Sequence, residues 1–435
     1  MESRISNILS RYPRSLFIVW SVVASFGAYF CMYAFRKPFN TGLYEGLTLW
    51  GMDYKTVLIV MQVLGYMLSK AIGIKVIAEL RAKNRVSLIL GLILFAELSL
   101  LGFGAVPYPY NWVFLFFNGL PLGMVWGVVF SFLEGRRFTE VLVFGLSISV
   151  IVASGILKSI YLLISAWMPG VNEFWMPVVM GGCFLPLFVL FVWMLSVIPA
   201  PTSADMRQRS ARIPMDNARK KAAFVFFGTG LLCFIVIYAL LTTLRDFRDN
   251  FSVEIWNVVD PDWQSGFLSL TELVSGVVVL ILIALLSLIK NNLVGFWTTG
   301  SLIALGLLGC SLSTLLYEWH VLSGFNWTLL LGISLFMAYT PIQTILFDRM
   351  LAAFRFRGNA GFFIYICDTA GYLGSVALLL YKEFFVVAPD PAQILINFSY
   401  GTSLIGFTTL LGAAWFFHRI EPAGGRVNQS ARHFN

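Results

Sequence analysis

Residues 277–282 read Val-Val-Val-Leu-Ile-Leu, a run that is apolar at every position. A transmembrane β-barrel strand alternates apolar and polar residues, so this run argues against a barrel and favours a helix. The run lies inside a longer apolar stretch over residues 263–289. A helix needs about 20 residues to cross the hydrocarbon core of a bilayer, so this stretch predicts a transmembrane helix.

Stretches of the same kind recur along the whole chain. Of the 435 residues, 58% are hydrophobic and only 12% are charged, and short polar breaks separate the apolar stretches. The pattern predicts an all-α membrane protein with twelve transmembrane helices. The predicted spans lie near residues 15–35, 55–78, 86–105, 112–133, 141–167, 175–197, 222–246, 263–289, 294–316, 326–347, 359–384 and 392–417.

The charges of the polar breaks predict the orientation of the chain and its division. Lysine and arginine collect in breaks of one parity and near both termini, whereas the other breaks carry mainly aspartate and glutamate. Because basic loops remain on the cytoplasmic side, we expect both termini in the cytoplasm. We predict six-helix bundles at 1–197 and 222–418, a basic cytoplasmic linker at 198–221 and a cytoplasmic tail at 419–435. The net charge of +8 reflects this asymmetry and is no argument for nucleic acid.

Ionisable side chains within or at the ends of the spans are the candidate functional residues. Such groups cost about 2.5–3.5 kcal/mol each on insertion scales, so they need a partner, a water cavity or a function. Arg36 and Lys37 close the first span, with Tyr33 one turn before Arg36. They either extend to the outer headgroups or bind a solute. Arg245 is the pseudo-equivalent of Arg36 in the second half.

Four more ionisable groups lie within the spans. Lys70 shares a helical face with Tyr66, and Lys158 shares one with serines and a tyrosine, so both are candidates for a cavity. For Lys70 the alternative is that it reaches the cytoplasmic basic cluster. Glu272 and Asp368 should be protonated or should face a basic partner such as Lys37 or Lys158. For these nine candidates the basic groups outnumber the acidic ones, which favours binding of an anion.

The seventh predicted span ends in a run of alternating charges. Residues 244–249 read Leu-Arg-Asp-Phe-Arg-Asp, and such a run is also typical of a solvated interfacial segment with paired charges. No enzymatic motif competes with these features, because the histidines, His320, His418 and His433, lie at span ends or in the tail. We therefore expect neither an enzyme nor a cofactor or metal site.

Several motifs resemble those of a known family. Residues 28–39 read Ala-Tyr-Phe-Cys-Met-Tyr-Ala-Phe-Arg-Lys-Pro-Phe, and residues 65–70 read Gly-Tyr-Met-Leu-Ser-Lys. In the second half, residues 339–341, 358–362 and 371–377 add Tyr-Thr-Pro, Gly-Asn-Ala-Gly-Phe and Gly-Tyr-Leu-Gly-Ser-Val-Ala. Together they resemble the organophosphate:phosphate antiporter family, which includes the glycerol-phosphate and hexose-phosphate carriers and belongs to the major facilitator superfamily.

The resemblance implies roles for several candidates. Arg36 and Arg245 would be the two substrate-binding arginines, Lys37 and Glu272 an ion pair between the halves, and Lys70 would face the pore. The resemblance is that of a divergent member, since Ser131 stands where the family's fourth helix carries arginine. Lys158 and Asp368 have no family counterpart. The resemblance also implies the inner membrane of a bacterium.

These features together predict a secondary active transporter that moves a small anionic metabolite, such as an organophosphate, phosphate or carboxylate, by alternating access. Its expected partners are that solute and the lipid bilayer, and a monomer is one option for its oligomeric state. Two alternatives stay open. One is a receptor that binds a phosphorylated ligand without transporting it, and the other is a membrane scaffold whose basic groups contact anionic headgroups.

Overall fold

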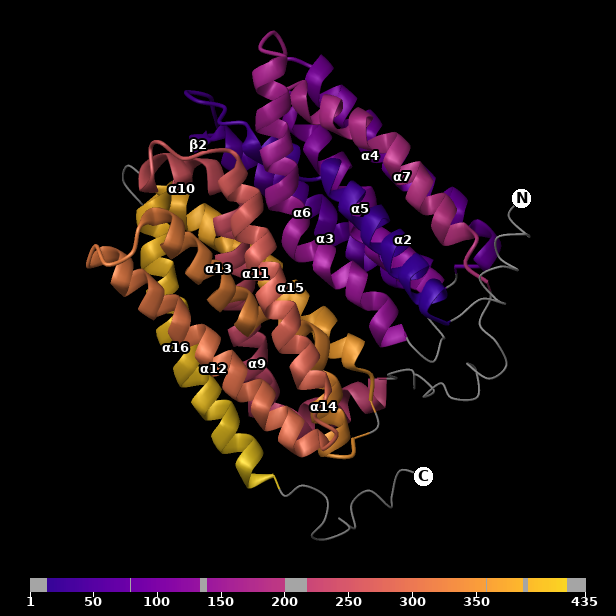
Figure 1. Ribbon diagram of the computed structural model, residues 1–435, viewed down its shortest axis with the longest axis vertical. Coiled ribbons are helices and arrows are strands. Elements are labelled where there is room, and N and C mark those ends of the chain that lie inside the picture. The colour runs from indigo at the N-terminus through magenta and orange to yellow at the C-terminus, as the bar shows by residue number, and fades with distance from the viewer. Residues whose placement is uncertain are drawn as a thin grey trace. The chain divides into compact units, whose positions relative to one another are not determined.

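The computed structural model describes residues 14–78, 80–133, 139–199, 217–356, 358–385 and 390–420. These residues are almost entirely helical, and the two-residue strands β1 and β2 pair antiparallel. The elements run in this order (Figure 1): α2 (Arg14–Ala34), η1 (Pro38–Thr41), β1 (Thr48–Leu49), β2 (Met52–Asp53), α3 (Tyr54–Ala78), η2 (Ala82–Asn84), α4 (Arg85–Ala105), α5 (Trp112–Leu133), α6 (Thr139–Trp167), α7 (Met176–Ser196), α9 (Asn217–Asn250), α10 (Ser252–Val259), α11 (Gly266–Ser287), α12 (Asn292–Glu318), α13 (Gly324–Pro341), η3 (Ile342–Leu346), α14 (Phe347–Ala353), α15 (Ala360–Phe385) and α16 (Pro391–Arg419).

Twelve helical segments in the described part of the chain are long and apolar enough to cross a membrane. The prediction of an all-α membrane protein with twelve transmembrane helices is therefore confirmed. Some ends differ from the predicted ones: the seventh segment runs over Lys220–Asn250 and the tenth over Gly324–Ala353. The tenth is longer because η3, a π-helix, and α14 continue α13 beyond Pro341. The side of the membrane on which the termini lie stays a prediction.

The chain separates into two compact units. The first unit comprises Met1–Ser210, Asp249–Leu273 and Leu379–Val387, and the second comprises Ala211–Arg248, Val274–Leu378 and Ala388–Asn435. The predicted division into bundles 1–197 and 222–418 stays a prediction. Most of the predicted linker, residues 200–216, and most of the predicted tail, residues 421–435, lie outside the described residues.

Small residues let the helices of the first unit approach closely. Here α3 packs on α5, and α2 packs on α6 and α7 (Figure 1). A Cβ on Gly65 of α3 would overlap the carbonyl oxygen of Phe116, and one on Gly119 of α5 would overlap that of Gln62. Helices in membranes associate through such small-residue contacts, because lipid removes the hydrophobic drive between them. The close crossing brings polar side chains of α3 and α5 together.

In the second unit α12 packs on α13 and α16. The helix α9 is interrupted at Gly228, whose φ of 32° lies in the left-handed region that favours glycine. Beyond this break α9 continues without interruption to Asn250. Gly371 of α15 faces Thr242 of α9, where a Cβ would come within 2.8 Å of the threonine side chain. The contact fixes α15 against the part of α9 that carries the arginine of this unit.

Candidate functional site

Arg36 lies two residues beyond the end of α2, against tyrosine rings. The helix ends at Ala34, and Pro38 opens η1, since a proline has no N–H to continue an α-helix. The Arg36 Cζ atom lies 4.0 Å from the ring centroid of Tyr66 and 5.8 Å from that of Tyr33. A guanidinium at this distance over an aromatic face forms a cation–π interaction. The structure thus brings three of the predicted residues together.

Lys70 joins the same group from α3. Its Nζ atom lies 5.5 Å from the Tyr66 ring centroid, one turn earlier on the helix. Gln62, a further turn back, donates hydrogen bonds to the Arg36 carbonyl oxygen at 2.9 Å and to Asn118 Oδ1 at 2.7 Å. These bonds fasten the chain after α2 to α3 and α5. The predicted face of Tyr66 and Lys70 therefore carries both a cation and an aromatic ring.

A second cluster in the first unit is centred on Asp249, at the end of α9. Lys37 Nζ lies 2.5 Å from Oδ2, and Lys158 Nζ lies 2.9 Å from Oδ1. Ser154 donates to Oδ1 at 2.5 Å. The side chains of Lys37 and Lys158 are only 9% and 1% exposed, and a buried charge is tolerated only when it is paired. We call Lys37, Ser154, Lys158 and Asp249 the Asp249 cluster.

The Asp249 cluster corrects one expectation from the sequence. Residues 244–249 do not form a solvated interfacial segment, because α9 continues to Asn250, and Phe247 and Arg248 are 2% and 8% exposed. Asp249 was not predicted as a site residue. The physical reason is that a charge at the end of a helix is usually solvated, whereas here two lysines cover it.

Glu272 lies on α11 close to α6, in the first unit. Its Cγ atom would be 2.5 Å from a Cβ placed on Gly155, so the carboxylate side chain packs against the backbone of α6. Gly155 precedes Lys158 by one turn of the same helix. The pairing of Lys37 with Glu272 that the family resemblance implies stays a prediction.

Further ion pairs of the first unit lie around the start of α3. Lys55 binds Glu254 of α10, and Lys382 Nζ lies 2.9 Å from Glu383 Oε1 and 3.6 Å from Asp53 Oδ2. Burial raises the pKa of Asp53, and the positive charge of Lys382 acts in the opposite direction. These residues were not predicted from the sequence, although Lys55 lies at the edge of an apolar span and could have indicated them.

Arg245 is the arginine of the second unit. Its Nε and Nη2 atoms donate to Asp246 Oδ1 at 3.1 and 2.7 Å, and Nη1 donates to the Tyr339 hydroxyl. The Cζ atom lies 4.5 Å from the Tyr339 ring centroid. The other oxygen of Asp246, Oδ2, accepts from Ser375 at 2.8 Å. Arg245 is thus held by one charge, one hydroxyl and one aromatic face.

A row of hydroxyl groups leads from Arg245 to Asp368. The rings of Tyr339 and Tyr238 stack with centroids 5.0 Å apart, and their hydroxyl oxygens are 2.9 Å apart. Tyr238 in turn donates to Asp368 Oδ1 at 2.6 Å. We call Arg245, Tyr339, Tyr238 and Asp368 the tyrosine chain. It joins the two predicted residues of this unit through two tyrosines that were not predicted as site residues.

A spacing in the sequence could have indicated one of these tyrosines. Tyr238 precedes Arg245 by seven residues, and Tyr29 precedes Arg36 by the same number. Two turns of helix place such residues on one face. The similarity between the two halves of the sequence therefore includes a tyrosine seven residues before each arginine. Tyr339 lies on a different helix, so no spacing along the sequence relates it to Arg245.

The arginines of the two units have surroundings of the same kind. In the ranges that the structure describes, no group of three or more His, Cys, Asp or Glu side chains could hold a metal ion. Each unit instead carries an arginine on a tyrosine face, Arg36 on Tyr66 and Arg245 on Tyr339. Guanidinium groups bind carboxylates and phosphates with two parallel hydrogen bonds.

Comparison with known proteins gives a family and a fold. A model described as a family of unknown function (DUF5690) matches residues 38–420. The chain belongs to this family. A search of curated protein sequences finds no match.

Several solved structures with a similar fold are those of transporters. The nucleoside transporter NupG has a TM-score of 0.61 at 15% identity, with 92% of this chain and 99% of that chain covered. A mutant of the peptide transporter POT in complex with alafosfalin has a TM-score of 0.64 at 12% identity, covering 97% and 99%. A D-xylose–proton symporter has 0.57 at 13%, covering 94% and 98%. The chain therefore has the major facilitator fold.

Proposed function

We propose that this protein is a secondary active transporter that moves a small anionic metabolite by alternating access. The observation that carries the proposal is the repeated arginine site: in each unit one arginine lies on the face of a tyrosine, within or at the end of a membrane-spanning segment. Structures with this fold belong to nucleoside, peptide and sugar transporters, which supports transport but not the class of solute.

The charges around Tyr66 favour an anionic solute. Arg36 and Lys70 share the ring of Tyr66, so this part of the first unit presents two cations on one aromatic platform. A phosphate or carboxylate group fits such a site, because charge-assisted hydrogen bonds contribute about 1.5–3 kcal/mol each. Organophosphate, phosphate and carboxylate are thus the first candidates, in keeping with the motifs at residues 28–39 and 65–70.

The proposed mechanism uses the two arginines in turn. In transporters of this fold the halves of the molecule rock about a central site. Arg36 of the first unit and Arg245 of the second would each bind the anion. Asp368 is the proposed proton site, because the tyrosine chain connects its carboxylate through two hydroxyl groups to Arg245, so that a change in its charge would reach the anion-binding arginine. We place the protein in the cytoplasmic membrane by its family resemblance.

The proposal is tested by ligand-induced stabilisation of the purified protein. Phosphate, sugar phosphates, glycerol phosphates, dicarboxylates and neutral sugars are added in turn, because a ligand that binds the folded state raises its apparent stability. We expect an anion to stabilise the protein, and we expect Arg36→Lys and Arg245→Lys each to weaken its binding about tenfold or more, since lysine keeps the charge but loses the paired hydrogen bonds.

Arg85→Lys is the matched control. Arg85 also lies over an aromatic ring, that of Phe132 at 5.6 Å, but it is at the start of α4 and outside the proposed site. Stabilisation by neutral sugars alone, or equal affinity in all three variants, would overturn the proposal. Uptake of the stabilising anion into proteoliposomes then separates a transporter from a receptor, because a receptor binds the anion without flux.

A further inference from the structure

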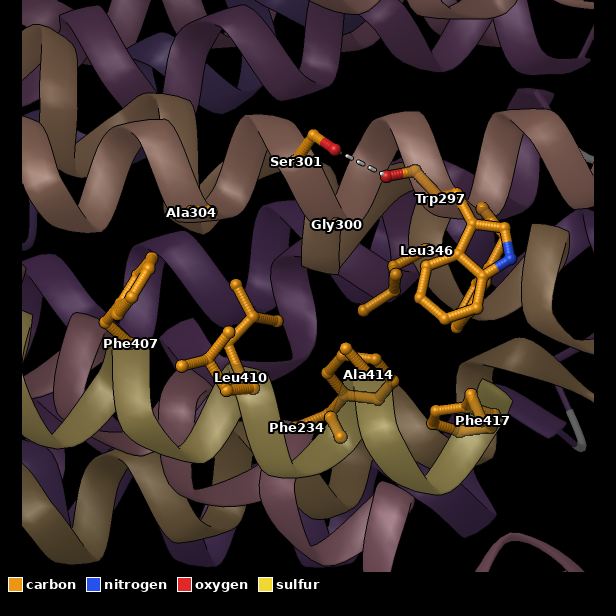
Figure 2. A pocket seen from close by; sticks show the side chains of 13 residues that line it. Phe234, Trp297, Gly300, Ser301, Ala304, Leu346, Phe407, Leu410, Ala414 and Phe417 are labelled. Carbon is orange, nitrogen blue, oxygen red and sulfur yellow. Dashed lines mark hydrogen bonds between the residues drawn. The ribbon is translucent and has the colours of Figure 1, made fainter. Parts of the chain in front are cut away.

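A half-open apolar hollow lies in the second unit, between α12 and α16. Phe234 of α9 and Leu346 of η3 are among its lining residues, and its volume is about 160 Å³. Figure 2 shows Trp297 and Phe417 at one end of the hollow and Phe407 toward the other. We call it the α12–α16 hollow. It shares no residue with the arginine sites.

The walls of the hollow offer almost nothing to a polar ligand. Ser301 carries the single hydroxyl group among the lining side chains, and it donates to the Trp297 carbonyl oxygen at 3.1 Å within the same helix (Figure 2). The remaining lining is aromatic, aliphatic or glycine. A hydrocarbon chain is the kind of ligand that gains free energy by entering such a space, at about 0.8 kcal/mol per buried methylene group.

One glycine keeps the hollow open. A Cβ placed on Gly300 would have no heavy atom within 4 Å, so no neighbouring helix requires a glycine there. A larger side chain at this position would therefore extend into the hollow and not into a neighbouring helix.

The helices beside the hollow are apolar enough to cross a membrane. Both α12 and α16 are membrane-spanning segments. Leu305 and Leu411 next to the hollow are 59% and 55% exposed on the chain itself, and leucines of a membrane-spanning helix that face outward contact lipid. Acyl chains of the bilayer would therefore lie next to the hollow and could enter it.

Cationic side chains stand at one end of the hollow. The start of α12 and the end of α16 meet there, since the rings of Phe296 and Phe417 are 5.1 Å apart. Arg349 donates to Asn292 at 2.9 Å, in the first turn of α12. Arg419 ends α16, with its Cζ atom 3.7 Å above the Trp415 ring. Cations and tryptophans at helix ends mark the headgroup level of a bilayer.

We propose that the α12–α16 hollow binds an acyl chain of an anionic phospholipid, whose phosphate group lies at Arg349 and Arg419. The apolar walls take the chain, and the two guanidinium groups at its end select a negative headgroup. The proposal is independent of the transport function, because it rests on residues outside the arginine sites.

The test counts phospholipids that stay bound during purification. The protein is purified from nanodiscs of equal parts phosphatidylglycerol and phosphatidylcholine, washed with detergent, and examined by native mass spectrometry. We expect retained phosphatidylglycerol in the parent protein. Gly300→Leu fills the hollow and should retain about tenfold less, which corresponds to the loss of about two buried methylene contacts. Arg419→Gln removes one of the two guanidinium groups and should lower the preference for phosphatidylglycerol over phosphatidylcholine.

Gly401→Leu is the control for the added side chain. Gly401 lies in α16 outside the hollow, and it also has open space around its Cβ position. It should retain lipid like the parent. Equal retention in Gly300→Leu and the parent, or no preference for phosphatidylglycerol in the parent, would overturn the proposal. If Gly300→Leu does not fold, Ala304→Leu, one turn further along the same wall, gives the same comparison.

Discussion

The Asp249 cluster and the tyrosine chain hold buried charges in opposite ways. In the cluster one carboxylate binds two lysines, Lys37 and Lys158. In the chain one guanidinium, that of Arg245, is divided between the carboxylate of Asp246 and a neutral hydroxyl group. The first arrangement depends on a single anion, whereas the second has a second, uncharged support.

Because of this difference, we expect the Asp249 cluster to serve stability and the tyrosine chain to serve ligand binding. Removing the carboxylate at the centre of the Asp249 cluster takes away the shared partner of two buried ammonium groups, so the cluster should contribute mainly to stability. At Arg245 an incoming anion can exchange with Asp246 while Tyr339 continues to hold the guanidinium. We therefore expect a ligand to bind at the tyrosine chain and not at the Asp249 cluster.

The largest effect is expected for Asp249→Asn. The amide keeps the shape of the side chain and removes its charge from Lys37 and Lys158. Breaking a buried ion pair costs about 3–5 kcal/mol, and we expect about 3 kcal/mol because the Asp249 side chain is 20% exposed. Denaturant unfolding of the purified protein measures the loss.

Asp390→Asn is the matched control for this change. Asp390 caps the N-terminus of α16 by accepting from the Ala392 N–H at 2.9 Å. Asparagine caps a helix about as well as aspartate, so the free energy of unfolding should change little. If the two variants are equally stable, the Asp249 cluster does not contribute to stability as we expect.

A smaller effect, on affinity, is expected for Asp246→Asn. The substitution removes the charge that competes with an anion for Arg245, and Tyr339 still holds the guanidinium. Binding of inorganic phosphate, followed by thermal stabilisation, should tighten about tenfold, or about 1.4 kcal/mol. Weaker binding would mean that Asp246 positions Arg245 instead of competing for it. The proposed contrast between a stabilising Asp249 cluster and a ligand-binding tyrosine chain would then be wrong.

The helices could be predicted from the sequence because the bilayer imposes a simple requirement on each one. The predicted span at 263–289 corresponds to α11, Gly266–Ser287, since a long apolar run has no stable alternative in lipid. The end of α9 was placed too early, at residue 246. There the charged residues 245–249 interrupt the apolar run, but buried partners allow the helix to continue.

The site was predictable only as a set of residue types. Helical spacing related Tyr66 to Lys70 and Tyr33 to Arg36, and cation–π contacts are present within both pairs. The partners on other helices were not predictable, because Lys158 and Asp249 are 91 residues apart and no local pattern relates them. A single sequence carries the periodicity of each helix but not the pairing between helices.

The smallest effect is expected for Tyr238→Phe, which removes only the hydroxyl group between Tyr339 and Asp368. Hydrogen bonds between membrane helices contribute about 0.6 kcal/mol each on average, so losing two of them should lower the free energy of unfolding by about 1 kcal/mol. Tyr381→Phe is the control, because Tyr381 is 54% exposed on α15 and its variant should stay within about 0.5 kcal/mol of the parent. Tyr238→Phe could instead lower the free energy of unfolding as much as Asp249→Asn does. Asp368 would then depend on the Tyr238 hydroxyl as strongly as the two lysines depend on Asp249, and the contrast between the two regions would be wrong.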